Sequence, residues 1–132
     1  MVSVPVLGVE PAVNVAKVAE QNVGALLLGQ DPFFASQPEL LVALAERFRI
    51  PTISPWQEHT NLGALMSYGA DLSDAYRHTG IYAARVLRGD KPADLPVQEA
   101  TKFNLVINLK TAKMLGLTVP NALLVSADEV IE

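Results

Sequence analysis

Two hydrophobic patterns alternate along this chain. Short apolar runs typical of buried strands alternate with stretches whose apolar residues stand three and four positions apart, a spacing that predicts amphipathic helices. The predicted strands cover residues 4–9, 25–28, 50–54, 65–68 and 103–107. The resulting order, β-α-β-α-β-(β)-α-β-α, predicts an α/β fold: an open parallel sheet with helices on both faces.

The predicted helices carry their own start and stop signals. Ser36 and Glu39 have the spacing of a capping box, which would begin a helix at that point. The clearest helix covers 72–88, with Asp71 as its N-cap and Gly89 just after its end. Three further helices are predicted to begin near Pro11, Asn108 and Pro120.

The strand order predicts where a ligand would bind. In open α/β sheets, ligands bind beyond the carboxyl ends of the strands. Segments 29–34, 54–57 and 67–69 follow or end three consecutive predicted strands, and they combine aromatic rings with hydrogen-bonding groups that suit a small organic ligand. The candidate ligand-binding residues are Gln30, Asp31, Phe34, Trp56, Ser67 and Tyr68, with Phe33 as a further aromatic neighbour.

A purely structural interpretation of the same residues stays open. Adjacent aromatic residues such as Phe33 and Phe34 commonly fill a core or a domain contact. Asp31 precedes a proline, where an aspartate often caps a helix or turns the chain. Trp56 could equally pack against the linker at 90–96. The convergence of these residues on equivalent strand ends favours a binding site.

Composition and charge narrow the possible functions. The chain has 132 residues, half of them apolar and 18% charged, which fits one globular domain. Its net charge is −4 and its basic residues are scattered, so we expect no nucleic-acid partner. It has no cysteine, and its two histidines, His59 and His78, are isolated and expected at the surface. We therefore expect no metal site.

Motifs for catalysis are missing as well. The glycines do not form a phosphate-binding loop, no nucleophile elbow occurs, and neither histidine has an obvious nucleophile partner. A phospho-acceptor role for Asp31 would need an acidic cluster at the first strand, where only Glu10 stands. We expect neither an enzyme nor a cofactor. The residues after Met1 do not form a signal peptide, which would imply the cytoplasm if Met1 is the natural start.

Several segments in fixed order resemble a known family. They are Leu65-Met-Ser-Tyr-Gly69, Tyr76-Arg77, the runs 85–97 (RVLRGDKPADLPV) and 101–120 (TKFNLVINLKTAKMLGLTVP), and Ala127-Asp-Glu-Val-Ile131. Together they resemble the C-terminal part of the substrate-binding proteins of ABC transporters, in the group similar to tryptophan- and tyrosine-binding lipoproteins. The resemblance extends over nearly the whole chain, because 24–34 and 40–51 also match.

The resemblance implies a type I periplasmic-binding-protein fold, in which two α/β lobes joined by a hinge close on a solute. Residues 1–69 would form a segment of the second lobe, and 70–132 a crossover helix, a linker and a C-terminal β-α segment. Asp31 would lie in a ligand-facing loop, with Ser67 and Tyr68 at a crossover near the cleft. Family members are longer, are periplasmic and work with an ABC permease.

Three functions stay open. The chain is a solute-binding component (or a fragment of one) that delivers a small organic solute such as an amino acid, a truncated self-associating remnant without a transport role, or a cytoplasmic metabolite-sensing module. A missing lobe would leave 72–87 and 103–107 with exposed apolar faces. We therefore expect a homodimer or higher oligomer, with exchange of the C-terminal segment across the linker at 90–96 as one route.

Overall fold

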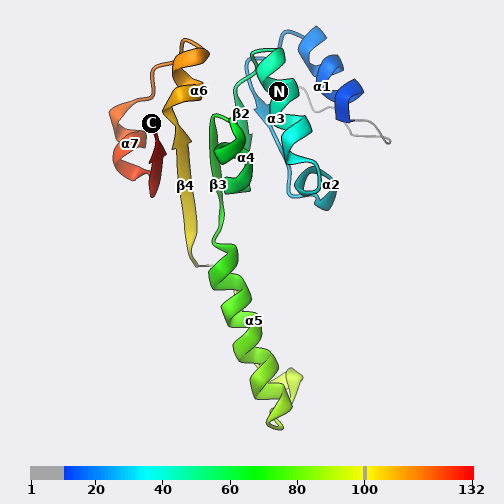
Figure 1. Ribbon diagram of the computed structural model, residues 1–132. Coiled ribbons are helices and arrows are strands. Elements are labelled where there is room, and N and C mark those ends of the chain that lie inside the picture. Colours follow the sequence, from blue (N-terminus) through cyan, green and yellow to red (C-terminus); the bar gives the residue numbers. More distant parts are fainter. Residues whose placement is uncertain (1–10, 100) are drawn as a thin grey trace.

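The computed structural model describes residues 11–99 and 101–132 and has an α/β fold built on one five-stranded sheet (Figure 1). The strands lie in the sheet in chain order: β1 (Leu26–Leu27), β2 (Thr52–Ser54), β3 (Met66–Ala70), β4 (Phe103–Asn108) and β5 (Glu129–Ile131). The predicted fold class is confirmed. The strand predicted at 4–9 lies outside the described residues, and β5 was not predicted.

One strand pair departs from the predicted parallel sheet. β1, β2 and β3 are mutually parallel, as are β4 and β5, whereas β3 and β4 are antiparallel. The cause is the route between them, because the chain leaves the sheet after β3 and re-enters β4 at the same edge (Figure 1). A parallel pair would need a crossover that returns to the opposite edge.

Seven α-helices and one 3₁₀ turn lie within the described ranges. They are α1 (Pro11–Glu20), α2 (Pro32–Ala35), α3 (Pro38–Arg47), α4 (Gln57–Leu62), α5 (Leu72–Leu87), α6 (Leu109–Met114), α7 (Asn121–Ser126) and the turn η1 (Pro92–Asp94). The helices predicted from Pro11, at 72–88, and after Asn108 and Pro120 are confirmed. The short helices α2 and α4 were not predicted, since neither is long enough to show helical periodicity.

Two predicted helix starts are confirmed and one is wrong. The Asp71 carboxylate accepts from the Asp74 amide at the start of α5, and the Asn108 side chain accepts from the Thr111 amide at the start of α6. Ser36 does not cap α3. Its hydroxyl donates to the Phe33 carbonyl and closes α2, because the extra helix uses up the residues that the capping box would have needed.

Much of the core lies on the face of the sheet that α4 covers, and Ile107 is buried on the opposite face. Val15 of α1 and Leu41 of α3 pack with Leu28, and α3 contacts α4, which covers β2, β3 and β4. Side chains that share the face under α4 along the strand register, such as Ser54 and Val106, are buried. Leu27, whose side chain points to the other face of the sheet, is 67% exposed. The helical cover over the two faces is therefore unequal in the part of the chain that the structure describes.

Helix α5 projects from the sheet, and among the elements that the structure describes it packs against no helix or strand over a substantial surface (Figure 1). None of its residues is buried, and the apolar side chains of Tyr76 and Leu87 are 74% and 88% exposed. The linker returns beside α5, where the Tyr82 hydroxyl donates to the Pro96 carbonyl at 2.6 Å. The expected exposure of 72–87 is confirmed. The same expectation for 103–107 is wrong at its end, because Val106 and Ile107 are fully buried between neighbouring strands.

Candidate functional site

A hollow of about 240 Å³ lies at the edge of the sheet where β2 and β3 end and β4 begins. The carboxyl ends of parallel strands are where open α/β folds bind ligands. The residues that line the hollow come from the loop after β2, from the start of α4, from β3, from the start of α5 and from β4. They are Pro55, Trp56, Gln57, Glu58, Ser67, Gly69, Ala70, Asp71, Leu72, Ser73 and Asn104.

The wall of the hollow depends on close backbone packing. A Cβ atom added at Gly69 would overlap the carbonyl oxygen of Pro55. Position 69 therefore accommodates only glycine unless the loop after β2 shifts. This packing sets the distance between the Trp56 loop and β3.

Ser67 offers an unused hydroxyl to the hollow. Its residue is 2% exposed, and its Oγ has no hydrogen-bond partner among residues 11–99 and 101–132. Burying an unpaired hydroxyl costs free energy, and such groups commonly mark the place of a ligand or water. Ser67 is thus poised to bond a molecule that enters the hollow.

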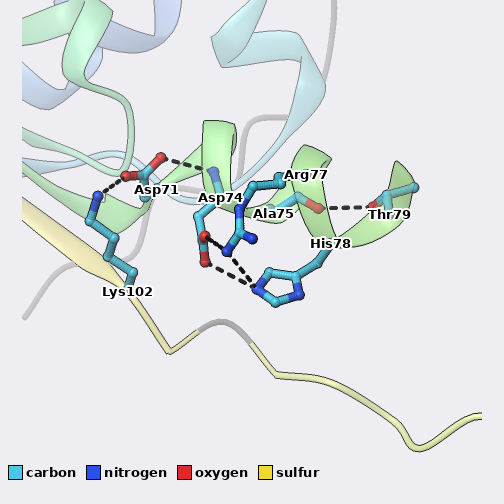
Figure 2. A network of polar contacts seen from close by, with 7 residues as sticks. All are labelled: Asp71, Asp74, Ala75, Arg77, His78, Thr79 and Lys102. Atoms are coloured by element: carbon cyan, nitrogen blue, oxygen red, sulfur yellow. Dashed lines mark hydrogen bonds and ion pairs between the residues drawn. The ribbon is translucent and has the colours of Figure 1, made fainter. Parts of the chain in front are cut away.

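Asp71 brings negative charge to the same place. Its carboxylate pairs with the Lys102 ammonium at 2.6 Å and accepts from the Asp74 amide at 3.1 Å (Figure 2). The hydrogen bond from Lys102, with the Asp74 amide second, lowers the pKa of Asp71 to about 2. The carboxylate is therefore ionised at neutral pH. Further along α5, Arg77 pairs with Asp74 at 2.8 Å and lowers its pKa as well.

His59 is buried, and its expected place at the surface is wrong. It is 1% exposed, because α4 turns it inward against β2, where its Nδ1 lies 2.6 Å from the Ser54 hydroxyl oxygen. Burial holds the pKa of His59 below its usual value, and the Phe34 main chain and two glutamates oppose that effect. The Ser54 oxygen also accepts from the Trp56 amide, and the Trp56 and His59 rings meet edge to face at 5.3 Å. His78, by contrast, is half-exposed on α5.

Only part of the predicted site lies around the hollow. Trp56 and Ser67 line it, whereas Gln30, Asp31, Phe34 and Tyr68 do not. Asp31 caps α2 by accepting from the Phe33 amide at 2.8 Å. Phe34 packs against the core and stands edge to face with Phe33. The ligand-binding roles of all six predicted residues stay predictions.

Tyr68 lies on the opposite face of β3 from Ser67, because successive residues of a strand point to opposite faces. Its ring is stacked on Phe103 at 5.7 Å, and the residue is 60% exposed. The predictions missed Asp71, whose sequence signal was a helix cap, and Asn104. Asn104 comes to the hollow only because β4 runs antiparallel to β3 and pairs it with Gly69.

The described residues contain no group of three or more potential metal-binding side chains. Among the described helices, none is both long and apolar enough to pass through a bilayer.

Comparison with known families and structures places this geometry in context. A family model described as ABC transporter substrate binding protein matches residues 2–131. A solved structure of a Streptococcus pneumoniae ABC domain in complex with L-Trp superposes with a TM-score of 0.84 at 32% identity, covering 91% of this chain and 40% of that one. A conserved domain protein from Vibrio cholerae superposes with a TM-score of 0.85 at 29% identity, again covering 91% of this chain and 40% of that one.

A relative known from sequence is the uncharacterized protein RP367 of Rickettsia prowazekii (strain Madrid E). It is 28% identical over 95 residues, which are 72% of this chain and 31% of that protein. The chain therefore spans about a third to two fifths of the length of these relatives.

Proposed function

Because the chain belongs to the family of ABC transporter substrate-binding proteins, we propose that it binds a small organic solute in the hollow at the carboxyl edge of its sheet. The observation that carries this proposal is the set of groups that converge there. The Trp56 indole offers an apolar face, and the Ser67 hydroxyl lacks a partner among the described residues. Asp71 is anionic, and Asn104 supplies an amide.

An amino acid is the solute class that fits these groups. The Asp71 carboxylate, which Lys102 already pairs, would take a ligand ammonium as a second cationic partner, while hydroxyl and amide donors suit a carboxylate. An indole wall favours an apolar or aromatic side chain. The complex of the Streptococcus pneumoniae domain with L-Trp supports the same class. We propose binding without catalysis, since no base lies within hydrogen-bond distance of the Ser67 hydroxyl in the described part of the chain.

The wider role follows from the family. We propose that the chain acts within a two-lobed binding protein that works in the periplasm and delivers its solute to an ABC permease. The chain covers 31% to 40% of these relatives, which is consistent with a second lobe that would close the hollow from the other side. A cytoplasmic metabolite-sensing module would use the same hollow, and a neighbouring signalling gene in place of permease and ATPase genes would favour it.

Thermal unfolding with single amino acids tests solute binding. L-tryptophan, L-tyrosine, L-phenylalanine and L-leucine are added in turn at millimolar concentration. A solute at one hundred times its dissociation constant stabilises the folded state by about 2.7 kcal/mol. The variant Asn104→Ala should lose this shift, while the control Tyr76→Phe, on α5 and outside the hollow, should retain it. Equal melting temperatures with and without all four amino acids would contradict the proposal.

The exposed face of α5 favours self-association as a second property. We propose that, in the absence of a second lobe, α5 packs antiparallel against α5 of a second copy. Its acidic residues Asp71 and Asp74 stand near the amino end, and Arg85 and Arg88 stand near the carboxyl end. An antiparallel pair places the helix ends of opposite dipole side by side and repeats the same contact twice, although Asp71, Asp74 and Arg85 already form ion pairs within the chain. Exchange of the segment after the linker at 90–96 would extend this interface.

Size-exclusion chromatography with light scattering at tens of micromolar tests the second property. A dimer is expected, and Tyr76→Lys should convert it to a monomer, whereas Leu27→Lys on the sheet should not. A monomeric parent protein would refute self-association. A dimer that binds no amino acid would favour the truncated remnant without a transport role.

A further inference from the structure

We propose that His59 is a positioning residue of the hollow: its neutral, buried ring fixes the Trp56 indole as a wall of the site, and protonation of the ring releases that wall. This inference rests on the proposed solute-binding function for its consequence, but its geometry stands apart from any ligand. It would make solute affinity depend on pH.

The link between the two rings runs through Ser54. Ser54 is the last residue of β2, and its Oγ lies 2.6 Å from His59 Nδ1 and 3.1 Å from the Trp56 amide nitrogen, which donates to it. The Trp56 backbone and the His59 ring are thus tied to the same oxygen. The Trp56 and His59 rings also contact each other directly: their centroids lie 5.3 Å apart, and their planes meet at 71°. This contact fixes the indole as well.

Burial makes this arrangement sensitive to charge. His59 is 1% exposed, and its Nε2 has no hydrogen-bond partner within residues 11–99 and 101–132. A second proton would place a cation on a buried ring whose charge the Ser54 hydroxyl and the Phe34 main chain offset only in part. Burying such a charge is costly unless it is paired, so the charged ring would move toward water. Because the rings touch, Trp56 would move with it.

The surrounding charges are few. Glu39 of α3 and Glu58 of α4 raise the pKa of His59, as does the Phe34 main chain, but desolvation outweighs them and the pKa lies below the usual value. Ser54 and Trp56, which contact the ring directly, carry no charge. The neutral ring therefore prevails near pH 7, and release of the wall is expected only in acid.

The composition of the chain provides a direct readout. Trp56 is the only tryptophan, so intrinsic indole fluorescence reports on this one ring. The chain has two histidines, and His78 is half-exposed on α5, far along the chain from Trp56. A cation beside an indole face or edge interacts with the ring and alters its emission. Fluorescence therefore follows His59 without any ligand.

The experiment is a titration of Trp56 fluorescence from pH 7.5 to 4.5, with far-ultraviolet circular dichroism recorded on the same samples. We expect one fluorescence transition with a midpoint below 6.5, the ordinary value for histidine, while the circular dichroism stays constant. His59→Gln should abolish the transition, and His78→Gln should retain it. A flat fluorescence profile in the parent protein, or an unchanged transition in His59→Gln, would overturn the proposal.

A second measurement covers the case in which His59→Gln does not fold. In His78→Gln, the single remaining imidazole is that of His59, and proton NMR of its ring gives its titration directly. Coincidence of the NMR and fluorescence midpoints supports the positioning role. Midpoints that differ by a full pH unit refute it.

The consequence for binding is measured by calorimetry with L-tryptophan. If only the neutral form binds, the dissociation constant one pH unit below the midpoint is about tenfold higher than at pH 7.5. In His59→Gln the dissociation constant should not vary over this range. A constant value in the parent protein would contradict the effect on binding. If L-tryptophan does not bind at any pH, the proposed solute fails, and the fluorescence titration still decides the role of His59.

Discussion

Ser54 and Ser67 are direct register partners on the parallel strands β2 and β3, and both are buried, yet only one of their hydroxyls is bonded. Ser54 Oγ contacts His59 Nδ1 and accepts from the Trp56 amide. Ser67 Oγ has no partner in the described part of the chain, and Ser67 is among the residues that line the hollow. The same residue type thus supports the fold at one strand end and stays available to a ligand one strand away.

Alanine at these two positions should separate stability from binding. Ser67→Ala removes an unpaired hydroxyl, so we expect the free energy of unfolding without ligand to stay within about 0.5 kcal/mol of the parent value. Ser54→Ala leaves the His59 ring without its partner and should cost about 1–2 kcal/mol. Urea unfolding measures both. A larger loss in Ser67→Ala than in Ser54→Ala would contradict the unpaired state of Ser67.

For solute binding we expect the opposite order: Ser67→Ala should have the larger effect and Ser54→Ala the smaller one. If the hydroxyl of Ser67 bonds the solute, Ser67→Ala should weaken binding of the amino acid that stabilises the parent protein by about fivefold to tenfold, as expected for one hydrogen bond of about 1 kcal/mol. Calorimetry with that amino acid provides the measurement. Ser67→Thr restores the hydroxyl and serves as the matched control. Equal affinities in the parent protein and Ser67→Ala would exclude Ser67 from the site.

Gly69→Ala should destabilise the protein and deform the hollow. Its new methyl group would overlap the Pro55 carbonyl, and overpacking of this kind costs about 1–3 kcal/mol. Gly80→Ala is the matched control, because a Cβ at that position of α5 meets no atom within 4 Å and alanine favours a helix interior by about 0.5–1 kcal/mol. The two glycines should therefore give changes of opposite sign in chemical unfolding.

The sequence predicted the parts of the fold that depend on local signals. The caps Asp71 and Asn108 and the stop at Gly89 are set by residues within one helical turn, and all three are confirmed. The Ser36 capping box failed because a second local signal, the Asp31 cap before Pro32, acts on the same residues. Local propensity alone cannot rank two overlapping caps.

The candidate site was only partly predictable for a different reason. The strand-end rule, which depends only on parallel strands, pointed to Trp56 and Ser67, and both line the hollow; their ligand-binding role stays a prediction. Asn104 required knowledge that β4 runs antiparallel to β3, a consequence of where α5 leads the chain. The burial of His59 depends on α4, a six-residue helix without a clear apolar stripe.

The stability of the first turn of α5 should depend on pH through the carboxyl group of Asp71. Its pKa of about 2 lies below the ordinary 3.8, mainly through Lys102, so its stabilising contribution is complete above pH 3.8 and is lost as pH falls toward 2. Asp71→Asn keeps a good N-cap but removes the charge, and Asp71→Ala removes both. Amide hydrogen exchange in the first turn of α5 should increase more in Asp71→Ala than in Asp71→Asn. Equal protection in both variants would show that the charge alone matters.

The titration of His59 should make the free energy of unfolding depend on pH as well, in a different pH range from Asp71. Its folded-state pKa is lowered by burial, so between that value and about 6.5 the unfolded chain binds more protons than the folded protein. The free energy of unfolding should therefore be greatest above pH 6.5, where His59 is neutral in both states, and should fall as pH decreases toward the folded-state pKa. Urea unfolding between pH 7.5 and 4.5 measures this slope. His59→Gln should flatten it and His78→Gln should leave it in place; a slope that persists in His59→Gln would assign the effect to carboxylates instead.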